Sequence, residues 1–221
     1  MSPTPHARSS RWQLALRQLV RQGWRLLPAA AVAAQRESPR EVVLTGRLIE
    51  VMQTRRFEHR GSTHALSAAG IEQVARAVQA VHLADGLLGA SERLYRLLTL
   101  GVTVTEFMPD GRKHQTTVPL IDWAHPQANR FDLALEPPML SAHGTHLRTP
   151  GAVAYINGLP LAVIETGTDD PQTGLDEAIQ RHLQNQCAHE IPHLYAHAHL
   201  LLALGGGQAR YGTTGTPARF W

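Results

Sequence analysis

Glu165 is the residue of this sequence best placed to do chemistry, because it ends an apolar segment that follows a tight turn. Asn157-Gly158 is a strong signal for a two-residue type I′ turn. It predicts a β-hairpin whose strands cover 152–156 and 159–165. The second strand is almost wholly apolar, so we expect it to be buried on both faces.

The register of this hairpin predicts which positions share a site with Glu165. With the Asn-Gly dipeptide in the turn, position 151 faces position 164 and lies within one residue of Glu165 across the ladder. Side chains alternate along a strand, so Glu165 and Gly167 share one face. Carboxylates at 151 and 165 would bind Mg²⁺ through hard oxygen ligands, and a lysine at 167 would orient or activate water. This is the chemistry of a metal-dependent nuclease, but the sequence has glycine at 151 and at 167.

Further patterns predict the elements that must position this hairpin. Apolar residues at helical spacing, capping residues and a Pro-Asp-Gly turn predict helices and a second hairpin before it. A helix and a last apolar segment, either a strand or a short helix, follow it. The helices expected before the Asn-Gly hairpin cover 11–24, a segment that begins after Ser38 as N-cap, Ser67 to 81 and Ser91 to 98. They are followed by a hairpin over 102–120 and a strand over 131–135. After the Asn-Gly hairpin we expect a helix over 175–187 and the last segment over 198–204. This order predicts an α/β fold of the mixed α+β kind around one sheet.

The composition excludes several classes of protein. The chain has 221 residues, 43% of them hydrophobic, which excludes a disordered protein. Its net charge of +3 and pI near 9.5 permit an anionic partner without demanding one. Cys187 is the only cysteine, so no disulfide scaffold or cysteine-based zinc cluster can form within the chain. Lys113 is the only lysine and belongs to no G-x-x-x-x-G-K-[ST] motif, so the sequence carries no P-loop ATPase. No targeting or membrane segment is recognisable, and we expect a cytoplasmic protein.

The hairpin sequence is also informative as a motif. It runs from Pro150-Gly151 through Asn157-Gly-Leu-Pro-Leu161 to Glu165-Thr-Gly167. It resembles the nuclease motif of the R (restriction, or motor) subunits of type I restriction enzymes, a PD-(D/E)xK signature. The family pattern is Pro-Asp, a hydrophobic strand, Asn-Gly-Leu-Pro-Leu, a second hydrophobic strand and Glu-x-Lys. The similarity extends over about residues 10–221. It implies a restriction-endonuclease-like core sheet flanked by helices, with an N-terminal edge hairpin.

The resemblance implies Mg²⁺-dependent, ATP-coupled cleavage of double-stranded DNA, with clear departures at the motif. The family's aspartate falls on Gly151 and its lysine on Gly167, which leaves Glu165 as the surviving catalytic acid and metal ligand. A family glutamate in the first helix falls near Gln13. The family's Gln-x-x-x-Tyr pair falls on residue 180 or 181 and residue 184 or 185, where no tyrosine stands. We therefore expect a degenerate, crippled cleavage centre, which Gly151→Asp with Gly167→Lys should restore if the scaffold is intact.

The resemblance also predicts an organisation and a set of partners. It divides the chain into a frayed terminus (1–9), a restriction-endonuclease-like domain (10–204) and a tail (205–221) that resembles the connection to a motor domain. Any role for ATP would depend on that motor, so the sequence predicts a truncated copy or a motor encoded separately. The implied partners are double-stranded DNA and the methyltransferase and specificity subunits of a type I complex. The alternative is a non-catalytic remnant that binds DNA or other subunits.

Two groups of basic side chains have both a structural and a functional interpretation. Arg17 and Arg21 belong to a series of arginines at helical spacing, which is either a solvated helix face or a contact to the DNA backbone. Arg148 is a further candidate for DNA binding. The histidines at 189, 193, 197 and 199 form the densest histidine group, which suits zinc but is more simply a feature of a histidine-rich composition.

Overall fold

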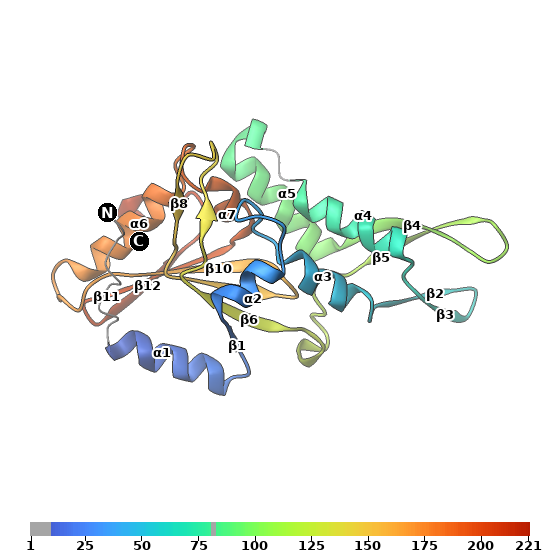
Figure 1. The fold of residues 1–221 in the computed structure, drawn as a ribbon, viewed down its shortest axis with the longest axis horizontal. Coiled ribbons are helices and arrows are strands. Elements are labelled where there is room, and N and C mark those ends of the chain that lie inside the picture. The colour runs from blue at the N-terminus through green and yellow to red at the C-terminus, as the bar shows by residue number, and fades with distance from the viewer. Residues whose placement is uncertain (1–9, 81–82) are drawn as a thin grey trace.

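The computed structural model describes residues 10–80 and 83–221, and a six-stranded mixed sheet forms its centre (Figure 1). The predicted frayed terminus, 1–9, lies outside the described residues. The strand order is β1-β6-β9-β10-β11-β12, with parallel pairing in β1–β6 and β10–β11 and antiparallel pairing elsewhere. The strands are β1 (Arg25–Leu27), β6 (Phe131–Leu135), β9 (Ala152–Ile156), β10 (Leu159–Thr166), β11 (Leu200–Gly205) and β12 (Gln208–Gly212).

Helices cover both faces of this sheet, as predicted for a mixed α/β fold. Helix α1 (Ser10–Arg21) covers one face, where Trp12 packs in a cluster with Leu133 and Ile164. The opposite face carries the other helices, whose buried side chains join the main core (Figure 1). These helices are α2 (Ala29–Ala34), α3 (Thr45–Met52), α4 (Ala68–Gln79), α5 (Gly86–Leu100), α6 (Gly174–Asn185) and α7 (Pro192–His197).

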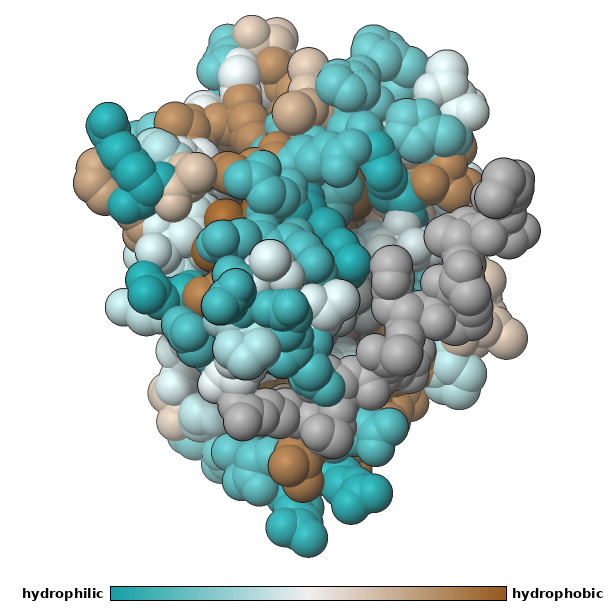
Figure 2. Space-filling view, turned by 90° about the vertical axis from the view of Figure 1, so that its left-hand side faces the viewer, coloured by the Kyte–Doolittle hydropathy of each residue, from teal (hydrophilic) through white to brown (hydrophobic). Residues whose placement is uncertain are grey.

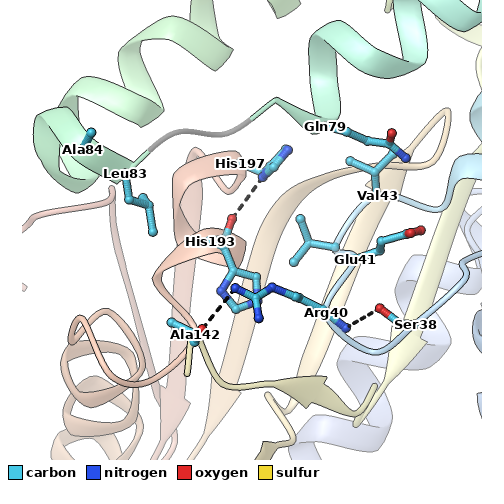
Figure 3. Close-up of a pocket in the computed structure, with 11 residues that line it drawn as sticks. Ser38, Arg40, Glu41, Val43, Gln79, Leu83, Ala84, Ala142, His193 and His197 are labelled. Carbon is cyan, nitrogen blue, oxygen red and sulfur yellow. Dashed lines mark hydrogen bonds between the residues drawn. The ribbon is translucent and has the colours of Figure 1, made fainter. Parts of the chain in front are cut away.

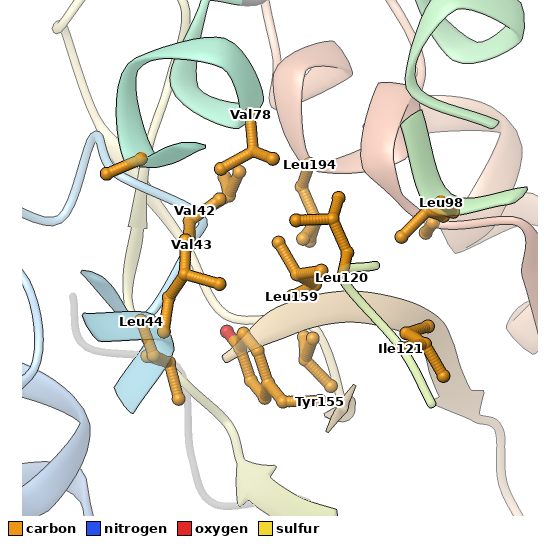
Figure 4. Packing of buried hydrophobic residues seen from close by; sticks show 14 of the residues in the cluster. Val42, Val43, Leu44, Val78, Leu98, Leu120, Ile121, Tyr155, Leu159 and Leu194 are labelled. Atoms are coloured by element: carbon orange, nitrogen blue, oxygen red, sulfur yellow. The ribbon is translucent and has the colours of Figure 1, made fainter. Parts of the chain in front are cut away.

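The main core is built where segments distant in sequence converge on the β9–β10 hairpin. Figure 4 shows the 42–44 segment, Val78 of α4, Leu98 of α5 and Leu194 of α7 around Tyr155 and Leu159. Tyr155 and Leu194 are completely buried. The hairpin that carries Glu165 is therefore held on this face by several helices at once, and its geometry is rigidly determined by packing.

Three two-stranded sheets stand apart from the central one. They are β2–β3 (Arg56–His59 and Ser62–Ala65), β4–β5 (Val102–Phe107 and Lys113–Val118) and β7–β8 (Met139–Leu140 and Leu147–Arg148). The predicted hairpin over 102–120 forms as β4–β5. It projects from the body alongside β2–β3, beyond the end of α4 (Figure 1). Short 3₁₀ turns complete the fold at Leu83–Asp85, Pro126–Ala128 and Ala218–Phe220.

One predicted helix start is wrong. Ser38 does not cap a helix; its hydroxyl accepts a hydrogen bond from the backbone of Arg40 at 3.2 Å and closes a local turn. The following segment is irregular, and Leu44 donates its backbone N–H to Gly158 at 2.8 Å, which ties it to the β9–β10 turn. Helix α3 begins only at Thr45. Ser67 does cap α4, accepting from Gly70 at 3.0 Å, whereas α5 begins at Gly86, before the predicted Ser91.

The C-terminal segment is part of the sheet. The sequence predicts 205–221 as a connecting tail, but β12 pairs with β11 along its whole length and forms an edge of the central sheet. Trp221 stacks on His182 of α6 with ring centroids 5.0 Å apart. The predicted boundary at 204/205 therefore falls inside a hairpin. Among residues 10–80 and 83–221, none of the helices combines the length and apolar character needed to cross a membrane.

Candidate active site around Glu165

The β9–β10 hairpin forms at the predicted turn, with a one-residue shift in its register. Asn157 and Gly158 have φ of 55° and 84°, the positive values that a type I′ turn requires. Beyond the turn a bulge lies between Pro160 and Ala162, because proline has no N–H to donate to the ladder. The observed pairs on either side of the bulge are Ile156–Leu159 and Ala152–Ile164. Position 151 therefore faces position 165, and the predicted pairing of 151 with 164 is wrong by one residue.

This shift places the backbone at position 151 directly against the Glu165 carboxylate. Gly151 donates its N–H to Oε2 at 3.2 Å. The other carboxylate oxygen, Oε1, accepts from Asn185 Nδ2 of α6 at 3.0 Å. Glu165 is only 2% exposed. The convergence of 151 and 165 predicted from the sequence is thus observed, in a covered site and not in an open cleft.

Burial sets the protonation of this carboxyl group. Removal from water raises the pKa of Glu165 to about 7, and the hydrogen bond from Gly151, the charge of Arg181 and the amide of Asn185 oppose that rise. Arg181 does not bind the carboxylate directly; its guanidinium donates to the backbone oxygen of Thr166 at 2.6 Å. Desolvation therefore outweighs the favourable contacts, and Glu165 is partly protonated near neutral pH.

A chain of buried polar groups continues from Glu165 into the core. Asn185 acts electrostatically on Tyr195, whose hydroxyl lies 3.1 Å from His182 Nδ1. His182 Nε2 is 2.9 Å from the backbone oxygen of Leu202, so Nε2 carries the proton and Nδ1 accepts from the tyrosine. Burial lowers the pKa of His182 to about 4, which keeps the imidazole neutral. Neutral polar side chains therefore fill the space between Glu165 and β11.

Sequence reasoning missed most of this chain. Arg181 and Asn185 are two of the alternatives for the Gln-x-x-x-Tyr positions, and the structure turns this pair, four residues apart on α6, toward the end of β10. Tyr195 and His182 have no motif to mark them. The only available signal is a polar side chain at an otherwise apolar helix position, since His182 is fully buried.

Gly167 is closed in by backbone. A Cβ at this position would overlap the carbonyl oxygen of Gly174, well inside the 3.0 Å that real Cβ atoms keep from other atoms. A Cβ at Gly205 would meet the same peptide. Glycine at 167, 174 and 205 therefore allows close backbone contact between the end of β10, the start of α6 and the β11–β12 turn. A lysine at 167 has no room unless Gly174 moves.

Gly151 is less confined. A Cβ there would lie 3.5 Å from Glu165 Oε2, so a side chain would point at the carboxylate, but it would also lie 2.8 Å from the backbone oxygen of Ile164. An aspartate at 151 therefore needs a small backbone adjustment, whereas a lysine at 167 needs a loop to move. The substitution pair expected to restore the motif meets this obstacle at its second position.

The sequence matches one known protein family over almost its whole length. A family model described as "Type I restriction enzyme R protein N terminus" matches residues 9–220. The chain belongs to this family.

A relative in Methanocaldococcus jannaschii, the "Putative type I restriction enzyme MjaIXP endonuclease subunit", is 31% identical over 121 residues. The matched segment is 54% of this chain but 11% of that protein's length. Membership in the R-protein family supports a restriction-endonuclease-like role for the domain. Because this chain matches only a small part of that longer protein, the activities and partners of the whole relative are proposals for this chain.

The residues around Glu165 do not fit the divalent metal that this family's chemistry implies. Mg²⁺ takes an octahedral set of oxygen ligands that combines one or two carboxylates with several waters, and a carboxylate that is 2% exposed leaves no room for those waters. Both oxygens of Glu165 already accept hydrogen bonds from N–H donors, and glycine at 151 supplies no ligand. Asp132, also buried, is bound by Arg25 and Arg47. Over the described part of the chain, no three His, Cys, Asp or Glu side chains are grouped to hold a metal.

The other predicted site residues lie away from this carboxylate. Gln13, Arg17 and Arg21 are exposed on α1, the helix that covers the opposite face of the sheet. Arg148 forms a two-pronged ion pair with the buried Glu190, and His146 lies 2.8 Å from the same carboxylate. The Arg148 hydrogen bond is the main cause that lowers the pKa of Glu190 to about 2. Arg148 therefore ties β8 to the segment before α7.

Two further features are the surface at the α6 end of the molecule and a cavity beside α7. Figure 2 looks onto the end of the molecule that carries α6, where hydrophilic side chains dominate the centre of the view.

A cavity of about 590 Å³ lies elsewhere, beside α7. Figure 3 shows Arg40, Gln79 and His193 among its lining residues. His197 of the predicted histidine group is held by backbone, with its ring nitrogens 3.0 Å from the oxygens of His193 and Val78.

Proposed function

We propose that this chain is the nuclease-like N-terminal domain of a type I restriction R protein in which phosphodiester cleavage has been lost. One observation supports this most: Glu165 is buried with both carboxylate oxygens bound to N–H donors, and glycine stands at both positions where the family has its second acid and its lysine. The domain keeps the scaffold of a cutting centre without the groups that would cut.

The energetic argument concerns the transition state of hydrolysis. A metal-dependent nuclease stabilises the developing charge on the phosphate with a cation held by carboxylates and prepares a water as the nucleophile. Loss of one such stabilising group costs roughly 3–4 kcal/mol, or a factor of about 10²–10³ in rate. Two missing groups therefore take the reaction toward its uncatalysed rate.

The proposed partners follow from the family and from the basic pI of the chain. We infer that the domain contacts double-stranded DNA, and the methyltransferase and specificity subunits, within a type I complex in the cytoplasm. Any ATP-driven translocation would be carried out by residues outside these 221, which contain no P-loop.

A plasmid assay tests the loss of cleavage. Supercoiled DNA is incubated with the purified chain and Mg²⁺ or Mn²⁺, in parallel with Glu165→Ala and with Glu177→Ala, a control at the first turn of α6. We expect no nicking above the level of buffer, or an equal trace from all three proteins. Nicking by the unsubstituted chain that disappears in Glu165→Ala alone would overturn the proposal.

A further inference from the structure

The two hairpins that project beyond α4 form a single arm. Hairpins β2–β3 and β4–β5 lie side by side at the far end of the molecule (Figure 1). Phe57 of β2 is buried between His64 and His114, with ring centroids 5.5 and 5.6 Å away. His59 packs on His114 at 4.3 Å. The aromatic contacts between the hairpins therefore hold their ends together.

The ends of this arm are rich in cations. Arg60 occupies the β2–β3 turn with φ of 49°, and Arg112 follows the Pro-Asp-Gly turn of β4–β5. Their side chains are 64% and 74% exposed. Arg56 and Lys113 add two further cations on the same hairpins, whereas Glu58 and Asp110 are the exposed acids. Asp110 lies 3.5 Å from Arg60 and 4.0 Å from Arg112, so it orients both guanidinium groups and neutralises only one charge.

The outer face of β4–β5 is polar and uncovered in the described structure. Its cross-strand pairs are Thr103–Thr117, Thr105–Gln115 and Phe107–Lys113. Phe107 is exposed, and Lys113 Nζ lies 5.7 Å from the centre of its ring. A two-stranded ribbon has the width that the major groove of B-DNA accepts, and hydroxyl, amide and cationic side chains are the groups that bind phosphates and base edges. The shape and chemistry of this arm favour duplex DNA over an apolar protein surface.

We propose that the arm formed by β2–β3 and β4–β5 binds duplex DNA, with Arg60, Arg112 and Lys113 on backbone phosphates. This inference rests on the proposed DNA-binding role of the domain and names the surface that performs it. It does not involve Glu165 or the centre around it.

His59, packed on His114 at the end of the arm, adds a dependence on pH. The pKa of His59 is lowered, first by desolvation and then by the charges of His114, Arg60 and His64, while Asp110 opposes the shift. Glu106 faces His114 across the ladder but is buried and accepts from the backbone of Ser67. A phosphate brought close to His59 favours the protonated form of this imidazole, so DNA binding takes up protons at His59. Affinity should rise as the pH falls below the usual histidine range, because the pKa of His59 is lowered in the free chain.

Fluorescence anisotropy with a labelled duplex tests the location of the DNA-binding surface. We expect Arg60→Gln with Arg112→Gln to weaken binding about tenfold and to lower the salt slope of log Kd by about two, one for each phosphate that is no longer neutralised. The matched control is Arg76→Gln with Arg96→Gln, at arginines of α4 and α5 that are 73% and 66% exposed. It should change affinity less than twofold.

Each result decides between the two proposals. Equal losses of affinity in the arm and control variants, or unchanged binding in both, overturn the arm as the DNA-binding surface while DNA binding by the domain stands. If the unsubstituted chain does not bind duplex DNA, the proposal that the arm binds DNA is wrong. The loss of cleavage is still tested separately by the plasmid assay.

A second measurement tests the pH dependence. Between pH 8 and pH 5.5 we expect the unsubstituted chain to gain affinity, and His59→Gln to lose most of that gain. His143→Gln, at an exposed histidine elsewhere, is the control and should keep the gain. Equal loss in both variants would show a general effect of net charge and overturn the histidine role.

Discussion

The pKa of Glu165 makes a prediction about stability that is independent of any activity. Replacing Glu165 by glutamine keeps the size of the side chain and its polar end but removes the ionisable group. In the folded chain this carboxyl has a pKa of about 7, compared with an ordinary value of 4.5. Folding therefore becomes less favourable as the pH rises, because the unfolded chain can ionise Glu165 before the folded one can.

The sign and the pH window follow from these two values. Below about pH 4.5 the group is protonated in both states, and its contribution to stability is fully present. As the pH rises through the folded-state pKa of about 7, that contribution is lost. The full gap corresponds to roughly 3 kcal/mol, and roughly 2–3 kcal/mol of it falls between pH 5 and pH 8. The glutamine variant has no such decline.

Urea denaturation at a series of pH values measures this difference. The free energy of unfolding of the unsubstituted chain and of Glu165→Gln should diverge by roughly 2–3 kcal/mol from pH 5 to pH 8, with the variant gaining relative stability at the higher pH. Any constant cost of glutamine, such as a poorer partner for Gly151 or Asn185, cancels in this comparison, and so does the titration of His182. Glu72→Gln, at an exposed position on α4, is the control and should leave the shape of the profile unchanged. Parallel profiles for the chain and Glu165→Gln would refute the reasoning.

Three further predictions concern the surroundings of this carboxylate. Gly167→Ala places a Cβ on the carbonyl of Gly174 and should lower the free energy of unfolding by roughly 3 kcal/mol, while Gly89→Ala inside α5 should stay within about 1 kcal/mol of the unsubstituted chain; equal effects in urea titrations would contradict the close backbone packing. Asn185→Ala removes the donor to Glu165 Oε1 and should cost about 1–3 kcal/mol by the same method, and a neutral result would show that the buried oxygen finds another partner. Millimolar Mg²⁺ or EDTA should leave Tm unchanged, because nothing around Glu165 fits the ion; a Mg²⁺-dependent rise in Tm that Glu165→Ala abolishes would contradict this.

The parts of the fold that could be predicted depend on local physics. The Asn157-Gly158 turn, the apolar β10 strand, the Ser67 cap and the helical spacing in α1 each need only a few neighbouring residues, and each forms as predicted. Ser38 has the same capping chemistry as Ser67, yet the segment after it is irregular and is held by a contact to the β9–β10 hairpin. Local preference is worth about 1 kcal/mol at such a position, and tertiary packing overrides it.

The candidate site also combines features that follow from local sequence with features that depend on tertiary packing. The motif directs attention to Glu165 and to the two glycines, and the hairpin brings 151 and 165 together as expected. The one-residue bulge after Pro160 and the covering of the carboxylate by α6 depend on how helices pack over the sheet. Asn185 reaches Glu165 through that packing, with Tyr195 and His182 paired in the core behind it, and no pattern in the sequence relates them.

The sequence by itself determined a turn, two strands and the single acid that follows them, because turn preference and side-chain alternation act between neighbouring residues. Only the tertiary structure decided what surrounds the acid. In the folded chain, N–H donors bind both oxygens of Glu165 and burial raises the pKa of its carboxyl group. The peptide of Gly174 fills the space beside Gly167. These outcomes depend on which distant segments pack together, and that is a property of the whole folded chain.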